Sequence, residues 1–150
     1  MIILKIGGSV ITDKKKENTF KQNIMDNFSS VIKKIDNDLI LVHGAGSFGH
    51  ILAKKFKLNE GYKTYEQVKG FSFTHEKVQL LNSYVLQSLH KYDIPAISIS
   101  PHSIVKLNNH VLEKIDYKIF KDYLDKKFIP VTFGDVALDR KRDWLARNEE

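Results

Sequence analysis

The sequence contains no cysteine among its 150 residues. Disulfides, thiolate metal sites and a cysteine nucleophile are therefore excluded. No apolar run approaches the roughly 18 residues that a membrane-spanning helix requires. Residues 1–8 also lack the basic segment and the long apolar segment of a signal peptide. We therefore predict a cytoplasmic protein that does not enter a membrane.

Several catalytic signatures are missing as well. The histidines lack HExxH-type spacing, so we predict no metal site made by protein ligands alone. We find no Ser-His-Asp arrangement, and the glycine and lysine spacing of a P-loop is absent. No repeat or low-complexity linker divides the chain, and its length suffices for one domain with a sizeable core.

The formal net charge is +6, and it comes mainly from lysines scattered along the chain. A nucleic-acid binder would gather such residues on one face, with arginine or aromatic partners. We therefore predict a lysine-rich solvated surface and no nucleic-acid partner. A few lysines facing a pocket for a phosphorylated small molecule are compatible with this pattern.

Short apolar runs, typical of buried strands, alternate with segments of helical periodicity. The predicted strands cover residues 2–6, 38–43, 94–99 and 128–133, with a short edge strand at 111–115. The predicted helices cover residues 20–35, 47–56, 65–90 and 117–124. We expect Ser47 to cap the second helix and Gly70 to bend or interrupt the third. The alternation predicts an α/β fold, a three-layer αβα sandwich with a mostly parallel open sheet.

Three glycine-bearing turns follow predicted strands: Gly7-Gly8, Gly44 to Gly46, and Gly134-Asp135. In open α/β sheets, ligands bind outside the carboxyl ends of the strands. The order of the chain therefore predicts that these turns share one edge of the sheet and form the ligand site.

The first turn belongs to the motif Lys5-Ile6-Gly7-Gly8-Ser9. Burial of an unpaired ammonium group is costly, so a lysine inside an apolar strand should face an anion. The two glycines let a backbone approach that anion and point amides at it. The motif suits a polyphosphate, and the alternative is a strand-end lysine that reaches solvent.

The second turn opens a predicted helix with the motif His43-Gly-Ala-Gly-Ser-Phe-Gly-His50. Free amides and the positive end of the helix dipole favour an anion at such a start. His50 follows one turn later and can donate to a phosphate. The alternative is a plain strand–helix turn.

Three further features have two readings each. Lys14, within the run Lys14 to Lys16, either lies in a solvated loop or stabilises a transferring phosphoryl group. Asp135 either closes a structural turn or has a functional role, in which it orders the glycine loops or sits near a metal ion. Phe71 and its aromatic neighbours either pack in the core or form an apolar wall for a substrate.

Together these residues resemble the isopentenyl phosphate kinases of the amino acid kinase superfamily. The matching stretches are residues 3–14, 42–50, 70–75 and 130–136. The resemblance implies the amino-terminal lobe of that fold, and phosphorylation of isopentenyl phosphate by ATP with Mg²⁺ in isoprenoid biosynthesis. It also implies a homodimer.

The resemblance also implies roles for individual residues. Implied catalytic residues are Lys5, Lys14 and His50. Implied ATP-binding residues are Lys5, Gly7, Gly8, Ser9 and Gly46. Implied contacts to the phosphate acceptor come from Gly44, Ala45, Gly49, His50, Phe71, Gly134 and Asp135.

Two departures from the family pattern change these expectations. Ala45 replaces a usual glycine, which is acceptable if its φ is negative. Residues 1–138 resemble the amino-terminal lobe, whereas we expect residues 139–150 to be a charged tail without resemblance and the nucleotide-binding lobe to be absent. We therefore expect this chain alone to be an inefficient kinase. The alternatives are a kinase of another phosphate or phosphonate acceptor, such as fosfomycin, and a non-catalytic phosphate-binding module.

Overall fold

The computed structural model describes residues 1–141 and 146–147. In chain order, its elements are β1 (Ile2–Ile6), α1 (Gly8–Ile11), α2 (Gln22–Ile32), β2 (Leu39–His43), α3 (Gly46–Lys55), a 3₁₀ turn η1 (Leu58–Glu60), α4 (Tyr65–Lys91), β3 (Ala96–Ser98), α5 (Pro101–Ile104), β4 (Val105–Asn108), β5 (Val111–Ile115), α6 (Lys118–Leu124), β6 (Ile129–Phe133), β7 (Val136–Asp139) and β8 (Ala146–Arg147). Within these residues, no helix combines the length and apolar character needed to span a membrane.

The main sheet has four strands in the order β1-β2-β6-β3, and all three pairings are parallel. The pairing continues into the turns, because the Gly44 amide donates to the Ile6 carbonyl and the Gly134 amide donates to the His43 carbonyl. The carboxyl ends of β1, β2 and β6 therefore lie side by side. This confirms the predicted parallel sheet and the shared edge of its glycine turns.

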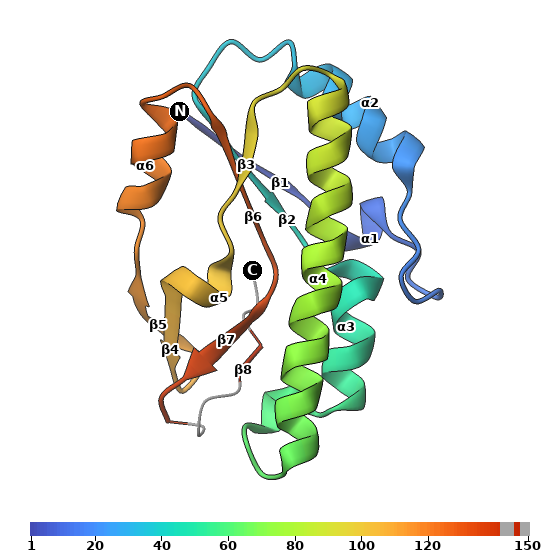
Figure 1. The fold of residues 1–150 in the computed structure, drawn as a ribbon, viewed down its shortest axis with the longest axis vertical. Helices are drawn as coiled ribbons and strands as arrows, with labels where there is room; N and C mark the ends of the chain where they lie inside the picture. Colours follow the sequence, from blue (N-terminus) through green and yellow to red (C-terminus); the bar gives the residue numbers. More distant parts are fainter. Residues whose placement is uncertain (142–145, 148–150) are drawn as a thin grey trace.

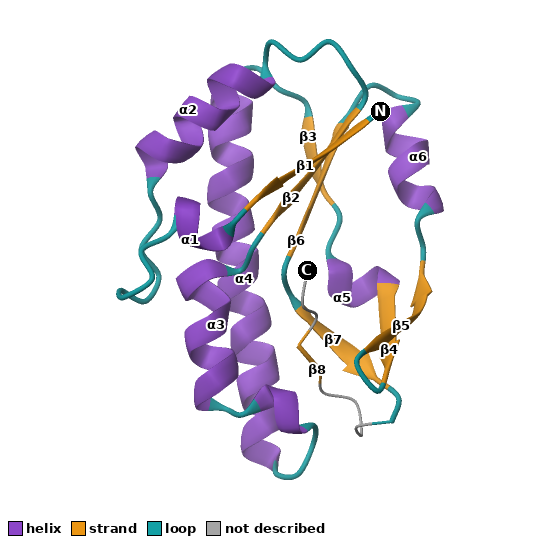
Figure 2. Cartoon of the chain, turned by 180° about the vertical axis from the view of Figure 1, so that it is seen from behind, coloured by secondary structure: helices purple, strands orange, loops and turns teal. Residues whose placement is uncertain are grey.

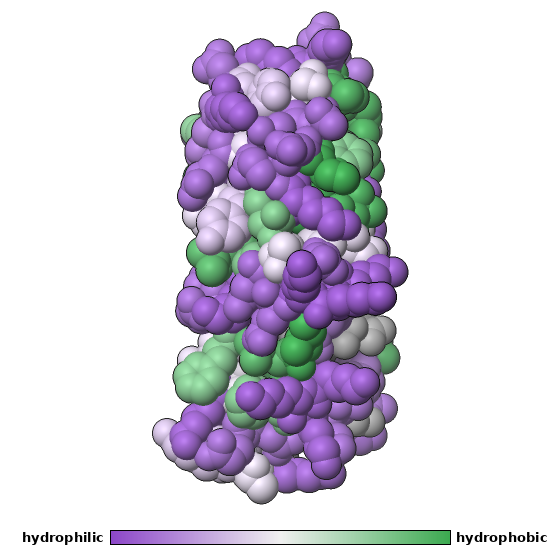
Figure 3. Space-filling view, turned by 90° about the vertical axis from the view of Figure 1, so that its right-hand side faces the viewer, coloured by the Kyte–Doolittle hydropathy of each residue, from purple (hydrophilic) through white to green (hydrophobic). Residues whose placement is uncertain are grey.

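Helices cover both faces of this sheet (Figures 1 and 2). Helices α1 to α4 lie on one side, and α6 lies on the other. The core between the sheet and the larger helical layer is apolar and includes the fully buried Leu41, Phe48 and Leu81. The outer surface of that helical layer is mostly hydrophilic, with hydrophobic residues in separate patches (Figure 3). The αβα architecture agrees with the prediction.

A second sheet with the order β5-β4-β7-β8 was not predicted, although β5 itself was. Strand β4 pairs with β5 antiparallel and with β7 parallel. Val105 and Leu107 of β4 are buried while the residues between and after them are exposed, so the period-2 pattern is present but only four residues long. Residues 142–145 and 148–150 of the expected charged tail lie outside the described residues.

Helix α4 is continuous over 27 residues, so Gly70 does not interrupt it. It begins with a capping box in which Thr64 and Gln67 exchange side-chain and backbone hydrogen bonds. A Cβ on Gly70 would lie 2.2 Å from the ring of Phe56. The glycine therefore serves close packing against that ring.

Smaller differences concern the ends of elements. The first residue of α3 is Gly46 and its N-cap is Ala45, so the predicted cap by Ser47 is wrong. Gly8 opens the four-residue helix α1, where a tight turn was expected. Strand β3 is three residues long, because Ser100 already caps α5 and Pro101 occupies its first turn.

Candidate active site

The first two glycine turns touch each other at the carboxyl edge. A Cβ on Gly8 would lie 2.3 Å from the backbone nitrogen of Gly46. Gly46 has a φ of +51°, and a Cβ there would lie 2.3 Å from the Thr12 hydroxyl oxygen. Both positions therefore require glycine, since a side chain would push the two backbones apart.

Thr12 ties the two turns together. Its buried hydroxyl donates to the Gly8 carbonyl over 2.7 Å and accepts a hydrogen bond from the Ser47 amide over 3.1 Å. The first turn of α3 is thereby fixed to α1. No local pattern in the sequence indicates this role, because it depends on a contact across 35 positions of the chain.

A cavity of about 420 Å³ opens beside these turns. The lining residues are Lys5, Gly7, Gly8, Ser9, Lys14, Gly46, Ser47, His50 and Ile51. Seven of them were predicted site residues. Among the described residues, the lining carries two ammonium groups and an imidazole but no carboxylate, so this cavity favours an anion.

Lys5 is exposed at this cavity, which corrects the expectation of a buried lysine. Because β1 is an edge strand of the sheet, its side chains are largely open to solvent. Lys14 is also exposed and lines the cavity, whereas Lys15 and Lys16 do not. One lysine of the cluster therefore faces the predicted site.

Ser47 was missed as a site residue. It is only 3% exposed, and among the described residues its hydroxyl has no hydrogen-bond partner. A buried hydroxyl without a partner is costly, so a ligand oxygen at the cavity would complete its hydrogen bonding. The ten-residue helix α3 starts beside it and directs its dipole to the same place. These features fit a phosphate group.

Three predicted acceptor contacts lie beside the cavity without lining it. Ala45 is buried in a small cluster with Val78 and Phe133, and its φ of −69° meets the condition set for an alanine there. A Cβ on Gly49 would lie 2.7 Å from side-chain atoms of both Ala45 and Val78, so this glycine permits close packing of α3 on α4. Gly44 is buried and continues the β1–β2 ladder.

Phe71 and the Gly134-Asp135 turn also lie outside this cavity. Phe71 is half-buried and packs against a cluster of Ala53, Leu58 and Val136. Gly134 is buried and continues the β2–β6 ladder. Their predicted acceptor contacts therefore stay predictions.

Asp135 faces two histidines. Both oxygens of its buried carboxylate lie within 3.0 Å of His75 Nδ1, and one accepts a hydrogen bond from the Val136 amide. Burial raises the pKa of Asp135 above its ordinary value, although the hydrogen bond from His75 acts in the opposite direction. Burial, together with the neighbouring His75, lowers the pKa of His102.

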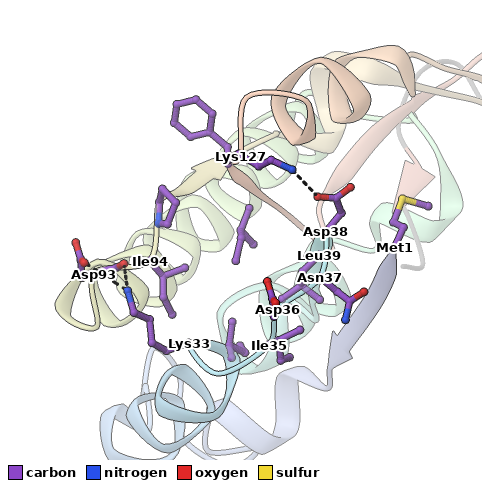
Figure 4. Close-up of a pocket in the computed structure, with 14 residues that line it drawn as sticks. Met1, Lys33, Ile35, Asp36, Asn37, Asp38, Leu39, Asp93, Ile94 and Lys127 are labelled. Atoms are coloured by element: carbon purple, nitrogen blue, oxygen red, sulfur yellow. Dashed lines mark hydrogen bonds and ion pairs between the residues drawn. The ribbon is translucent and has the colours of Figure 1, made fainter.

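A larger cavity of about 530 Å³ lies at the opposite, amino edge of the main sheet (Figure 4). Its lining includes Lys33 and Lys127, which pair with Asp93 and Asp38 over 3.4 and 3.6 Å. It therefore carries charges of both signs, and two of its lysines already pair with aspartates. In the described part of the chain, no glycine turn or start of a long helix directs amides into it, so it is the weaker candidate despite its size.

The sequence model of the amino acid kinase family matches residues 1–149, and the chain belongs to that family. Within it, the chain is similar to isopentenyl phosphate kinases, as its motifs predicted. It is 36% identical over 150 residues to that of Methanothermobacter thermautotrophicus, covering 95% of this chain and 56% of the relative. It is 34% identical over 157 residues to that of Methanocaldococcus jannaschii, covering 96% and 59%.

Solved structures of isopentenyl phosphate kinases also resemble this chain. An X-ray structure of isopentenyl phosphate kinase superposes with a TM-score of 0.87 at 32% identity, covering 96% of this chain and 62% of that one. The product complex of the Thermoplasma acidophilum enzyme gives 0.86 at 32% identity, covering 99% and 61%. Aspartate kinase from Synechocystis, at 15% identity and a TM-score of 0.62, shares the fold. The chain thus spans less than two thirds of the length of these isopentenyl phosphate kinases.

Proposed function

We propose that this chain forms the phosphate-binding part of an isopentenyl phosphate kinase, which converts isopentenyl phosphate and ATP into isopentenyl diphosphate and ADP. The observation that carries the proposal is the cavity at the carboxyl edge. It joins Lys5, Lys14 and His50 to two touching glycine turns. The similarity to isopentenyl phosphate kinases supports isopentenyl phosphate as the acceptor.

In this reaction an oxygen of the acceptor phosphate forms a bond to the γ-phosphorus, and the bond from that phosphorus to the ADP oxygen breaks. The acceptor is the nucleophile, so the protein needs to supply only position and positive charge. His50 would hold the acceptor phosphate, and Lys5 and Lys14 would stabilise charge on the transferring group. Ser47 adds a donor to the predicted set.

When bound, ATP supplies the phosphoryl group and Mg²⁺ neutralises its phosphate oxygens. The amides of Gly8 and Gly46 with the Ser9 hydroxyl fit the phosphates. The described lining residues include no carboxylate, so Mg²⁺ here would depend on the phosphate oxygens and on hydroxyls such as those of Ser9 and Ser47.

The remaining parts of the proposal concern the whole protein. Because the chain spans only 56% to 59% of these archaeal relatives, we predict that it binds the acceptor but, by itself, turns over well below the roughly 1–100 s⁻¹ of ordinary kinases. A cytoplasmic location, a homodimer and the domain boundary at residue 138 stay predictions.

Calorimetric titration of the chain with isopentenyl phosphate tests the proposal. His50→Ala should weaken binding about 10- to 100-fold, since a hydrogen bond to a charged group contributes roughly 1.5–3 kcal/mol. His50→Gln, which keeps a donor, should lose less. His110→Asn, at an exposed position with a φ of +64° that asparagine tolerates, is the matched control.

Fosfomycin, inorganic phosphate and isopentenol are the comparison ligands. We expect isopentenyl phosphate to bind best and isopentenol, which has no phosphate, to bind poorly. Tighter binding of fosfomycin would favour the phosphonate kinase instead. Equal affinity of isopentenyl phosphate for the wild-type chain and His50→Ala would remove the assigned role of His50.

A further inference from the structure

Three side chains from separate elements converge outside the cationic cavity: His75 of α4, His102 of α5 and Asp135 of the turn between β6 and β7. One ligand atom of each residue lies within 4.8 Å of the others. His75 Nδ1 is 2.9 Å, and His102 Nδ1 is 3.7 Å, from the same carboxylate oxygen of Asp135. The two imidazole rings have centroids 4.0 Å apart.

The burial of these groups is graded. The Asp135 side chain is fully buried, that of His75 is 20% exposed, and that of His102 is 37% exposed. The site therefore has a closed floor and a side open to solvent. Ser100 stands at that side, where its hydroxyl lies 2.8 Å from His102 Nδ1 and 3.5 Å from the carboxylate.

We propose that His75, His102 and Asp135 bind a divalent transition-metal ion, with Zn²⁺ as the representative ion. Two imidazoles and one carboxylate are a ligand set that such ions accept while a further position stays open to water. Mg²⁺ prefers oxygen ligands alone, so this site is distinct from the Mg²⁺ of the proposed kinase reaction and does not depend on that reaction.

The geometry requires little rearrangement. Zinc–ligand bonds of about 2.0–2.1 Å in a tetrahedron separate ligand atoms by about 3.3 Å. The separations among the three ligand atoms start at 2.9 Å and do not exceed 4.8 Å. Movement of the half-exposed His102 ring by up to about 1.5 Å would bring the widest separation of 4.8 Å to the tetrahedral value. The ion would then fasten α4 and α5 to the β6–β7 turn.

The test is titration of the chain, free of any histidine tag and stripped with a chelator, with ZnCl₂. We expect one equivalent of Zn²⁺ to bind and to raise the melting temperature. His102→Ala should weaken zinc binding at least about tenfold, because even loss of residues that only support metal ligands costs this much. His75→Ala should do the same. His110→Asn, a change at an exposed histidine outside the cluster, should bind zinc like the wild type.

Co²⁺ gives a second readout, because its visible absorption depends on coordination geometry. The wild-type chain should develop cobalt bands that His102→Ala lacks, and excess Mg²⁺ should leave them unchanged. Equal zinc affinity in the wild type and His102→Ala, or no saturable zinc binding by the wild type, would overturn the proposal. If His75→Ala fails to fold, the zinc affinity of His102→Ala alone tests the proposal. The more exposed His102 ring contributes less to packing than the His75 ring does.

Discussion

The cavity at the carboxyl edge of the main sheet is smaller than the one at the amino edge, about 420 against about 530 Å³. The smaller cavity is built on two touching glycine turns and contains the buried Ser47 hydroxyl, and the charged groups of its described lining residues are all basic. The larger one has lysines and aspartates that pair with each other. Backbone approach and a lining of one charge sign, more than volume, therefore distinguish a binding site from a surface hollow here.

The largest difference between the edges should appear when a methyl group is added to a glycine turn. Gly8→Ala places a Cβ against the backbone of Gly46. Backbone atoms cannot move aside as a flexible side chain can, so we expect a loss of about 3 kcal/mol or more in the free energy of unfolding, together with loss of phosphate binding. Urea unfolding measures this loss.

Asn37→Ala at the amino edge is the control for that substitution. Asn37 is exposed and lines the larger cavity, so its replacement should change the unfolding free energy by no more than about 0.5 kcal/mol. A Gly8→Ala chain as stable as Asn37→Ala would contradict the expectation that the carboxyl edge tolerates substitution less than the amino edge does.

Loss of the two hydrogen bonds made by the Thr12 hydroxyl should have the next largest effect on the free energy of unfolding. Thr12→Val keeps the size of the side chain but removes the hydroxyl that joins the Gly8 carbonyl to the Ser47 amide. We expect a loss of about 1–3 kcal/mol in unfolding free energy, because buried polar groups lose their partner. Thr12→Ser, which keeps the hydroxyl, should lose only about 1 kcal/mol, from one buried methyl group. Equal losses in the two variants would show that packing, and not the hydrogen bonds, holds the turns together.

Asp26 connects α2 and α4 by hydrogen bonds, and it does not line the cavity at the carboxyl edge. Its carboxylate accepts hydrogen bonds from Lys91, Ser88 and Gln22 of α4 and α2. These bonds, that of Lys91 first, lower the pKa of Asp26 from 3.8 to about 2. The full shift corresponds to about 2.4 kcal/mol. Because the Lys91 side chain is 62% exposed, solvent reduces this to about 1–2 kcal/mol.

The pH dependence follows from the direction of that shift. A carboxyl group with a lowered pKa in the folded state stabilises the protein above its unfolded pKa of about 4, and this stabilisation is lost as the pH falls toward 2. The difference in unfolding free energy between the wild type and Asp26→Asn should therefore shrink from pH 6 to pH 2. A difference that stays constant over this range would contradict the assigned role of the charge.

The smallest effect should come from the ion pairs around the larger cavity. The Lys127 side chain is 84% exposed and lies 3.6 Å from Asp38. Exposed pairs of this kind contribute little, so Lys127→Ala should change unfolding free energy by less than about 0.5 kcal/mol and leave isopentenyl phosphate binding unchanged. Weaker binding in this variant, measured by calorimetry, would indicate that isopentenyl phosphate binds at the amino edge.

The carboxyl edge could be predicted from the sequence because its signals are local. Short apolar runs predicted β1, β2 and β6, and the glycines after them marked turns that a parallel sheet must bring together. Seven predicted residues line one cavity for this reason. The second sheet was missed because β4 and β7 have four residues each and pair across about 30 positions of the chain.

Residues whose roles depend on distant contacts could not be predicted. Thr12 and Ser47 look like ordinary hydroxyl residues until α1 and α3 are side by side. Gly70 suggested a bend because the aromatic ring that fills its space comes from Phe56, in another segment. His75 and His102 are 27 positions apart on different helices, so no local metal-binding pattern could reveal their approach to Asp135.

The central claim is that the carboxyl edge, and not the larger cavity, receives the phosphate. Backbone amide NMR during titration with isopentenyl phosphate tests it most directly, because one experiment reports on both edges. We predict that the amide signals of Gly8, Gly46 and Ser47 shift in a saturable way, while those of Asn37 and Asp93 stay in place. Shifts confined to the amino edge, or no saturable shifts at the glycine turns, would contradict the account.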